Sequence, residues 1–213
     1  MSYQIENIYA KRFLYFNLYV IKGSDGDILI DTGFLCMKRK IKRWLDKFNI
    51  KLIILTHAHV DHTWNTNYIK KLYNCEVAFS KKDLENIDNT KINTEPLDKR
   101  YNAWTKFMRF GMKHCKPKVY DIDYYLEDEE VINKYGLDLK VVSLAGHTTG
   151  SIGILYKDYL FAGDALVNRK NKPSLAYQNQ NTLKAYETYN KIKEINPKVI
   201  FVGHDRKIEC SNL

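Results

Sequence analysis

The sequence predicts an α/β protein in which two β-sheets lie between layers of helices. Stretches with the pattern of strands precede a stretch with the pattern of a helix, and this order occurs twice along the chain. The 213 residues suit one domain, or one domain with an insertion. Hydrophobic residues make up 45% of the chain, which is enough for a sizeable core. We therefore expect a single domain over residues 1–213, built from two similar halves.

The first half begins with strands. Aromatic and branched residues before the hairpin signal Asp25-Gly26, and apolar runs after it, predict strands over residues 15–22, 27–31, 52–55 and 76–79. A basic amphipathic helix is expected over 37–48, because its apolar residues recur at i, i+3, i+4 and i+7. A second helix is expected over about 64–72.

The second half repeats this order. One strand is predicted to end at residues 131–132, and further strands are predicted over 137–144, 151–156, 159–161 and 199–202. A helix over 182–195 has large apolar residues spaced by three, and Pro197 interrupts it. Since loops that follow strands commonly carry functional residues, the polar motifs after these strands are expected to meet at one edge of the fold.

An apolar segment separates the two halves. Residues 88–115 have no counterpart in the second half and hold many large apolar side chains: Tyr101, Trp104, Phe107, Met108, Phe110 and Met112. We interpret the segment as an inserted helical hairpin. It is expected either to cover the pocket as a lid or to form the interface of a homo-oligomer.

Charge and cysteine usage narrow the class of protein. Lys and Arg number 34 and Asp and Glu 25, which gives a net charge of +9. We interpret this as a solvated basic surface rather than a nucleic-acid site, because no basic run accompanies an RNA-reading motif. The four cysteines lack C-x-x-C spacing and are expected to be free thiols. Neither a signal sequence nor a membrane-spanning stretch is recognisable, so we expect a cytoplasmic protein without a membrane partner.

Five of the six histidines lie in motifs typical of a metal-dependent hydrolytic site. The motif H-x-H-x-D-H occupies residues 57–62. Three motifs that begin with glycine follow it: G-H-T at 146–148, G-D at 163–164 and G-H at 203–204. Metal centres need imidazole nitrogens and carboxylate oxygens that converge on one point. The pattern therefore predicts that these distant segments meet.

The first motif supplies ligands for more than one metal position. In an extended loop, residues two apart face the same way, so the rings of His57 and His59 can reach one metal. Asp61 and His62 then turn toward a second position. Asp164 can bridge the two, because a carboxylate has two oxygens and the metals of such sites lie about 3.5–4 Å apart.

In its motifs and their order, the chain resembles the metallo-β-lactamase superfamily, and most of all its glyoxalase II-like dinuclear hydrolases. The resemblance extends from the D-T-G at residues 31–33 to His204. It implies a four-layer αβ/βα sandwich with two divalent metal ions, and we expect zinc, with iron or manganese as alternatives. It further implies that His57, His59 and His147 hold one metal, that Asp61, His62 and His204 hold the other, and that Asp164 bridges both. Asp31 resembles the buried Asp that orients the ligand loops in this family.

Several departures from glyoxalase II bear on the substrate. That enzyme carries a C-terminal helical domain that helps to bind glutathione, whereas this sequence ends nine residues after His204 (213 − 204 = 9). Ser151 stands where a histidine is common, and Trp64 stands where a small residue is common. Glutathione thioesters are therefore not the expected substrates. The true zinc β-lactamases lack the bridging Asp, so Asp164 argues against antibiotic hydrolysis.

The expected function is hydrolysis of an ester, thioester or lactone of a small molecule. A metal-bound hydroxide would attack the carbonyl, and Asp61 would orient the nucleophile or shuttle its proton. The alternatives are a phosphodiesterase or nuclease, a mononuclear iron enzyme like the persulfide dioxygenases, and a metal-sensing or metal-binding module without turnover.

A few further polar residues are not placed in the site. His114 is interpreted as a structural or surface residue, Tyr177 as a core residue, and Arg169, Lys170 and Lys172 as part of a solvated loop.

Overall fold

Two sheets form the centre of the structure, a computed structural model that describes residues 2–88, 94–97, 120–170 and 172–210. The seven-stranded first sheet has the order β1 (Ser2–Ile5), β2 (Ile8–Phe13), β3 (Phe16–Lys22), β4 (Asp27–Ile30), β5 (Ile50–Ile54), β6 (Glu76–Ser80) and β8 (Tyr124–Leu126). The six-stranded second sheet has the order β17 (Ile208–Glu209), β16 (Val199–Val202), β12 (Tyr159–Gly163), β11 (Ile152–Tyr156), β10 (Leu137–Ser143) and β9 (Val131–Lys134).

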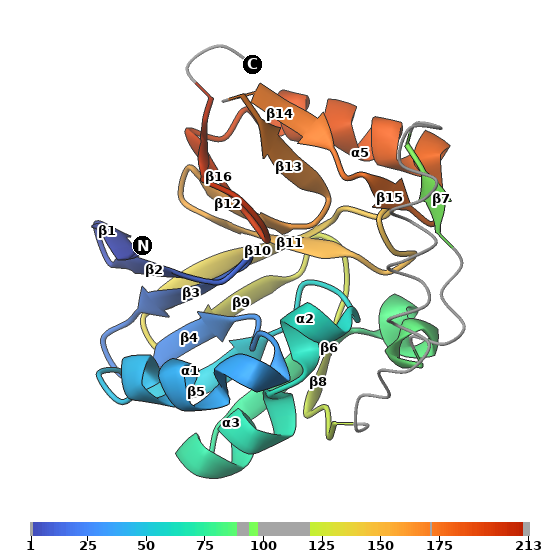
Figure 1. Ribbon diagram of the computed structural model, residues 1–213. Coiled ribbons are helices and arrows are strands. Elements are labelled where there is room, and N and C mark those ends of the chain that lie inside the picture. The colour runs from blue at the N-terminus through green and yellow to red at the C-terminus, as the bar shows by residue number, and fades with distance from the viewer. Residues whose placement is uncertain (1, 89–93, 98–119, 171, 211–213) are drawn as a thin grey trace.

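Helices cover the outer face of each sheet. Among the described residues they are α1 (Lys38–Leu45), α2 (Val60–Thr63), α3 (Thr66–Tyr73), α5 (Thr182–Ile195) and two 3-10 helices at Leu35–Met37 and Lys81–Ile87. In Figure 1, α1 and α3 lie below the first sheet and α5 lies above the second. Three apolar clusters fill the spaces between these layers. One lies between the two sheets, one lies between the first sheet and helices α1 and α3, and one lies between the second sheet and α5. The protein is therefore a four-layer αβ/βα sandwich, as the sequence predicts.

The apolar run in β5 shows why the chain takes this arrangement. Leu52 and Ile54 point into the cluster between the sheets, whereas Ile53 and Leu55 point into the cluster under the helices. Both faces of this strand are buried, which explains an uninterrupted apolar sequence instead of an alternating one. β4, β5 and β6 are parallel, as are β12 and β16. Their carboxyl ends therefore lead out at one edge of the sandwich.

The sequence analysis missed or shortened several elements. β1 and β2 were not predicted, and α1 ends at Leu45 instead of residue 48. The helix expected over 64–72 is preceded by the one-turn helix α2, which carries part of the first motif. Two small two-stranded sheets were also missed: the hairpin of β13 (Leu166–Arg169) with β14 (Lys172–Leu175), and the pairing of β15 (Gln178–Asn179) with the distant β7 (Glu95–Pro96).

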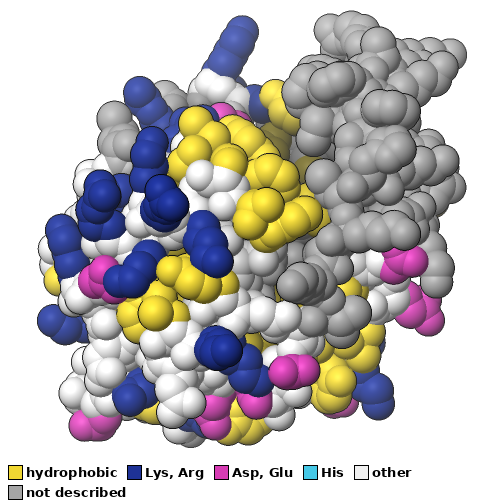
Figure 2. All heavy atoms as spheres, turned by 60° about the horizontal axis from the view of Figure 1, so that its bottom comes forward, with side chains coloured by type: hydrophobic (Ala, Val, Ile, Leu, Met, Phe, Trp, Pro, Cys, Tyr) yellow, Lys and Arg dark blue, Asp and Glu magenta, His cyan; other side chains and the backbone are white. Residues whose placement is uncertain are grey.

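The basic helix faces solvent as predicted. Ile41, Trp44 and Leu45 are the buried residues of α1, and the lysines and arginines lie on its other side. Figure 2, which brings this side of the molecule forward, shows Lys and Arg side chains gathered around apolar ones. No helix within the described part of the chain is long and apolar enough to cross a membrane.

Most of the apolar segment at 88–115 lies outside the described residues, including Trp104, Phe107, Met108, His114 and Cys115. Its role as a lid or an interface stays a prediction. The other three cysteines, Cys36, Cys75 and Cys210, are free thiols as expected.

Candidate metal centre

The seven residues of the predicted ligand set meet at the edge where the parallel strands end. His57 and His59 follow β5, and Asp61 and His62 lie on α2. The remaining three follow strands of the second sheet: His147 after β10, Asp164 after β12 and His204 after β16. Segments up to 147 residues apart in the sequence (204 − 57 = 147) thus converge on one place.

The side chains form two groups, each with its ligand-type atoms within 4.8 Å of one another. His57, His59 and His147, with Asp164, form group one, and Asp61, His62 and His204 form group two. In group one, Nδ1 of His59 lies 3.1 Å from Nε2 of His57 and 2.9 Å from Nε2 of His147. In group two, Nε2 of His204 lies 3.5 Å from Oδ2 of Asp61.

Asp164 lies between the two groups. Its Oδ2 is 3.7 Å from Nε2 of His147 in group one and 3.0 Å from Nε2 of His204 in group two. Its Oδ1 is 3.4 Å from Nε2 of His62, also in group two. One buried carboxylate therefore has group-one and group-two nitrogens near its two oxygens.

In three of the histidine rings, the outer nitrogen Nδ1, which faces away from the cluster, contacts an oxygen acceptor. Nδ1 of His62 is 2.7 Å from Oδ2 of Asp31. Nδ1 of His147 is 2.8 Å from the carbonyl oxygen of Gln178, and Nδ1 of His204 is 2.8 Å from that of Tyr15. These oxygens only accept, so in each case Nδ1 carries the proton and donates it. In a neutral ring, Nε2 then presents its lone pair to the cluster.

A relay through a hydroxyl orients His57. Nδ1 of His57 lies 3.0 Å from Oγ1 of Thr56, and this hydroxyl lies 2.9 Å from Oδ2 of Asp31. The carboxylate only accepts, so Thr56 donates its one hydroxyl hydrogen to Asp31 and accepts from His57. Asp31 thus contacts one predicted ligand directly and another through Thr56. The sequence analysis singled out Asp31 but missed Thr56, Gln178 and Tyr15, and the latter two act through backbone carbonyls that no motif reveals.

Burial keeps the three imidazoles of group one neutral. It lowers the pKa of His57 and of His59 well below the ordinary value, and it lowers the pKa of His147. Rings without a proton on the inner nitrogen are the form that binds metal.

In group two, nearby carboxylates outweigh the effect of burial on the histidine pKa values. Burial acts to lower the pKa of His62, but Asp164 and Asp31 outweigh it and raise that pKa well above the ordinary value. For His204 burial is again opposed, chiefly by Asp164, and its pKa rises to about 9. Burial acts to raise the pKa of Asp164, yet His204 and His62 hold it well below the ordinary value. At neutral pH the metal-free cluster therefore has two imidazolium groups and an ionised Asp164.

The donor set fits divalent cations. Nε2 of His62 and Oδ1 of Asp164 are buried and face each other at 3.4 Å, but neither makes a hydrogen bond within the described part of the chain. Buried polar atoms in native proteins are rarely left in this state. Imidazole nitrogens and carboxylate oxygens are the ligands that zinc, iron and manganese accept.

A pocket of about 480 Å³ opens over the cluster. Its floor includes ligand-type residues of both groups and Asp164. Tyr15, Val167, Ala176 and Tyr177 supply apolar wall surface. Tyr177, for which the sequence suggests a core position, therefore faces the pocket instead. The volume is in the range of small-molecule sites.

Other residues singled out in the sequence lie outside the cluster. Trp64 packs edge-on against Phe34 and is not among the residues that line the pocket. Ser151 is buried, with its Oγ 2.7 Å from the Thr148 hydroxyl. The Arg169 guanidinium stacks on the ring of Tyr177 at 4.2 Å from the ring centre.

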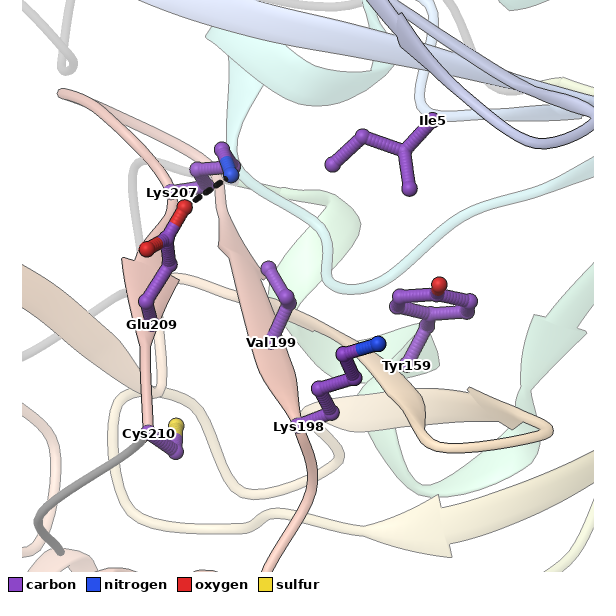
Figure 3. Close-up of a pocket in the computed structure, with 7 residues that line it drawn as sticks. All are labelled: Ile5, Tyr159, Lys198, Val199, Lys207, Glu209 and Cys210. Carbon is purple, nitrogen blue, oxygen red and sulfur yellow. Dashed lines mark hydrogen bonds and ion pairs between the residues drawn. The ribbon is translucent and has the colours of Figure 1, made fainter.

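A second pocket, of about 410 Å³, lies by the outer strands β1 and β17. Figure 3 shows its seven lining residues, among which Lys207 is paired with Glu209. None of the seven is a residue of group one or group two. This pocket is therefore distinct from the candidate metal centre.

The sandwich, with a His- and Asp-rich cluster at the ends of its parallel strands, is the architecture of a metal-dependent hydrolase. The model of the metallo-β-lactamase superfamily matches residues 13–204, and the chain belongs to that superfamily.

Two curated relatives illustrate its place there. A probable metallo-hydrolase of Methanocaldococcus jannaschii is 32% identical over 154 residues, which cover 70% of this chain and 66% of the relative. Hydroxyacylglutathione hydrolase 1 of Vibrio vulnificus is 25% identical over 195 residues, 90% of this chain and 63% of the relative. The chain thus spans less than two thirds of the length of these two relatives.

Solved structures share the fold. A metallo-β-lactamase family protein from Thermus thermophilus superposes with a TM-score of 0.71 at 21% identity, covering 97% of this chain and 76% of that one. A subclass B3 metallo-β-lactamase of Bradyrhizobium japonicum superposes with a TM-score of 0.69 at 24% identity, covering 95% of this chain and 77% of that one.

Proposed function

We propose that the protein holds two divalent metal ions and hydrolyses an ester, thioester or lactone. Group one would hold one ion and group two the other, with Asp164 bridging them. The observation that carries this proposal is the position of Asp164, whose oxygens lie 3.0–3.7 Å from nitrogens of both groups. A mononuclear site has no need for this second set of residues. We expect zinc, with iron and manganese as alternatives.

The ions, when bound, would lower the pKa of a water molecule and polarise the carbonyl of the substrate. The chain contributes the arrangement around them. Asp31 and the carbonyls of Gln178 and Tyr15 hold the outer ring nitrogens, so the inner ones stay aimed at the cluster. Asp61 lines the pocket, and its carboxylate would orient a water and take its proton.

The pocket favours a carbonyl substrate over a phosphodiester. Its described lining contains the carboxylates of Asp61, Asp164 and Asp205 but no Lys or Arg. A nucleic-acid substrate would need cations beside its flanking phosphates. The name of the Vibrio vulnificus relative, a hydroxyacylglutathione hydrolase, supports thioesters as one substrate class.

Metal content and a substrate panel test the proposal together. Protein loaded separately with zinc, iron and manganese should hold about two equivalents, as dinuclear sites do. It should cleave an activated ester, a thioester or a lactone faster than bis(4-nitrophenyl) phosphate. One equivalent under metal-replete conditions, with activity confined to iron, would instead favour a persulfide dioxygenase-like enzyme. Faster phosphodiester cleavage would favour a nuclease.

The variant Asp164→Ala tests whether Asp164 bridges the two ions. It should lose at least about one of two metal equivalents and most of the activity, because each ion loses a shared ligand. The exposed Asp138 on β10 offers a matched control, since Asp138→Ala removes a carboxylate far from the motifs. Unchanged metal content in Asp164→Ala would contradict the bridging role.

A further inference from the structure

A second buried carboxylate, that of Asp83 on the 3-10 helix Lys81–Ile87, contacts two of the loops that carry the motifs. Its Oδ2 accepts from the backbone N–H of Ala58 at 2.7 Å, and its Oδ1 accepts from the backbone N–H of Gly150 at 3.0 Å. Ala58 lies in the H-x-H part of the first motif, and Gly150 ends the loop G-H-T-T-G. These two loops supply all three histidines of group one. One side chain therefore joins them.

The ring of His59 lacks the kind of support that the other rings of the cluster have. Within the described part of the chain its Nδ1 contacts only the imidazoles of His57 and His147, and its Nε2 makes no hydrogen bond. No oxygen acceptor orients this ring, so its place depends on its backbone. The N–H that Asp83 binds belongs to Ala58, the residue directly before His59.

The loop of His147 packs directly on the 3-10 helix that carries Asp83. A Cβ atom on Gly150 would lie 2.3 Å from the backbone nitrogen of Asp83, so this close approach requires a glycine. Asn86, on the same helix, donates from Nδ2 to Oδ1 of Asp83 at 2.6 Å and to the hydroxyl of Thr149 at 2.9 Å. The helix therefore holds this loop through two neighbouring residues, and both contacts involve Asp83 or its partner.

The position of Asp83 requires an acceptor at each oxygen. A carboxylate offers two acceptors, whereas the amide of Asn offers one acceptor and one donor group. In Asp83→Asn, the N–H of either Ala58 or Gly150 would therefore face a donor. Both sites are buried, so water does not readily replace the lost acceptor.

We propose that Asp83 is a positioning residue that sets the separation of the two loops and so brings the three histidines of group one together for a metal ion. It acts through the backbone, and it is not a member of either group. Its role for group one parallels the direct contact of Asp31 with His62 in group two. The inference rests on the proposed metal-dependent function.

Zinc titrations of Asp83→Asn test this role, because the variant preserves the size of the side chain and removes one acceptor. Zinc binding at group one should weaken about 10- to 100-fold, the range that follows the loss of outer partners of metal ligands. Group two should keep its zinc. Isothermal titration measures the affinities, and nitrogen NMR of the imidazole rings identifies which histidines bind zinc.

Asp27 provides a matched control. It is also a buried carboxylate with a backbone N–H at each oxygen, from Gly23 at 3.3 Å and from Asn49 at 2.7 Å. It lies at the amino end of β4, whereas the cluster lies beyond the carboxyl ends of the parallel strands. Asp27→Asn should lower stability in urea about as much as Asp83→Asn, yet leave zinc binding at both groups unchanged.

Hydrogen exchange of the metal-free protein gives a readout that needs neither metal nor turnover. In Asp83→Asn, at least one of the amides of Ala58 and Gly150 should exchange about tenfold faster or more, while in Asp27→Asn both stay protected. Asn86→Ala is the milder variant if Asp83→Asn does not fold. It keeps the carboxylate but removes a donor to it, and should weaken zinc binding at group one about two- to tenfold.

The outcomes separate this inference from the proposed function. If the unaltered protein hydrolyses no ester, thioester or lactone, the hydrolytic function fails, while the zinc and exchange measurements still decide the role of Asp83. If Asp83→Asn or, where that variant does not fold, Asn86→Ala binds zinc at group one as tightly as the unaltered protein, the inference is overturned and hydrolysis stands. Equal losses of zinc affinity in Asp83→Asn and Asp27→Asn would also overturn it, because they would reflect a general loss of stability.

Discussion

At the scale of single residues, group one and group two of the candidate centre differ in the protonation of their histidines. The imidazoles of group one are neutral in the metal-free protein because burial lowers their pKa values. His62 and His204 of group two carry protons at neutral pH, and the pKa of His204 is about 9. Metal must displace those protons, since only the unprotonated nitrogen can be a ligand.

We therefore expect metal binding to be stepwise in pH. Near pH 6 group one should bind metal while group two stays protonated, and near pH 9 both should fill, roughly as the displaced protons require. Filling of group two should release protons at neutral pH, and filling of group one should release none from its imidazoles. Titrations in buffers of different ionisation enthalpy measure the proton count, with elemental analysis at both pH values as the second readout. Equal occupancy of about two metals at both pH values would contradict this order.

The close packing around Gly203 explains why a glycine precedes His204. A Cβ atom at this position would overlap Oδ1 of Asp164 and lie 2.6 Å from Cε1 of His62. Gly203→Ala should therefore displace Asp164 and reduce metal content by about one equivalent, although no ligand is removed. Metal analysis and a far-ultraviolet circular dichroism spectrum together separate this effect from unfolding. Full metal content in Gly203→Ala would show that the bridge tolerates the shift.

At the scale of elements, the sequence predicted the buried strands well and also the ends of α5, although Leu183 and Tyr186, two of the apolar residues that suggested this helix, are exposed. The boundaries expected for α5, residues 182–195, are those observed. The buried strands β5, β6 and β16 were likewise found within two residues. β1 and β2 were missed because exposed and part-exposed residues interrupt their apolar pattern. The hairpin β13–β14 was missed because its four-residue strands are short and carry basic residues.

The same contrast applies to the candidate site. Its side chains were predicted because H-x-H-x-D-H and the later glycine-led motifs specify residue type and order. The contacts that orient them depend on backbone carbonyls, such as that of Gln178, and on a wall residue, Tyr177, delivered by the missed hairpin. Such contacts arise from the path of the chain in space, so local sequence patterns do not contain them.

The packing of α5 depends on Gly146. A Cβ atom there would lie 2.5 Å from both the backbone nitrogen and Cα of Ala185 in α5, and φ of Gly146 is +140°. Gly146→Ala should destabilise the protein by about 2–4 kcal/mol, because overpacking against a backbone adds to the strain of that φ. Urea unfolding measures the loss. Asn181→Ala, which removes the side chain that caps α5, should cost only about 1 kcal/mol and provides the comparison.

At the scale of the whole molecule, the cluster lies on the seam between the two halves. Group one takes His57 and His59 from the first half and His147 and Asp164 from the second, and group two takes Asp61 and His62 from the first half and His204 from the second. Backbone hydrogen bonds cross the same seam, from Asn17 to Gly203 and from Ile152 to Thr56. The apolar cluster between the sheets already joins the halves. Bound metal would therefore add to an existing association and would not be required for folding.

Removal of metal should accordingly lower stability without unfolding the protein. A ligand present at about 100 times its Kd stabilises the folded state by about 2.7 kcal/mol. For a chain of this size each kcal/mol corresponds to about 2–4 °C in Tm, so each metal should contribute about 5–11 °C. Scanning calorimetry with excess EDTA measures the shift, and EDTA saturated with zinc controls for effects of the chelator itself. Because the apolar cluster between the sheets joins the two halves without metal, they should still unfold in one transition after chelation. Two separate transitions after chelation would show that the halves depend on metal for their association, and a Tm that does not change as metal is lost would show that the ions do not stabilise the fold.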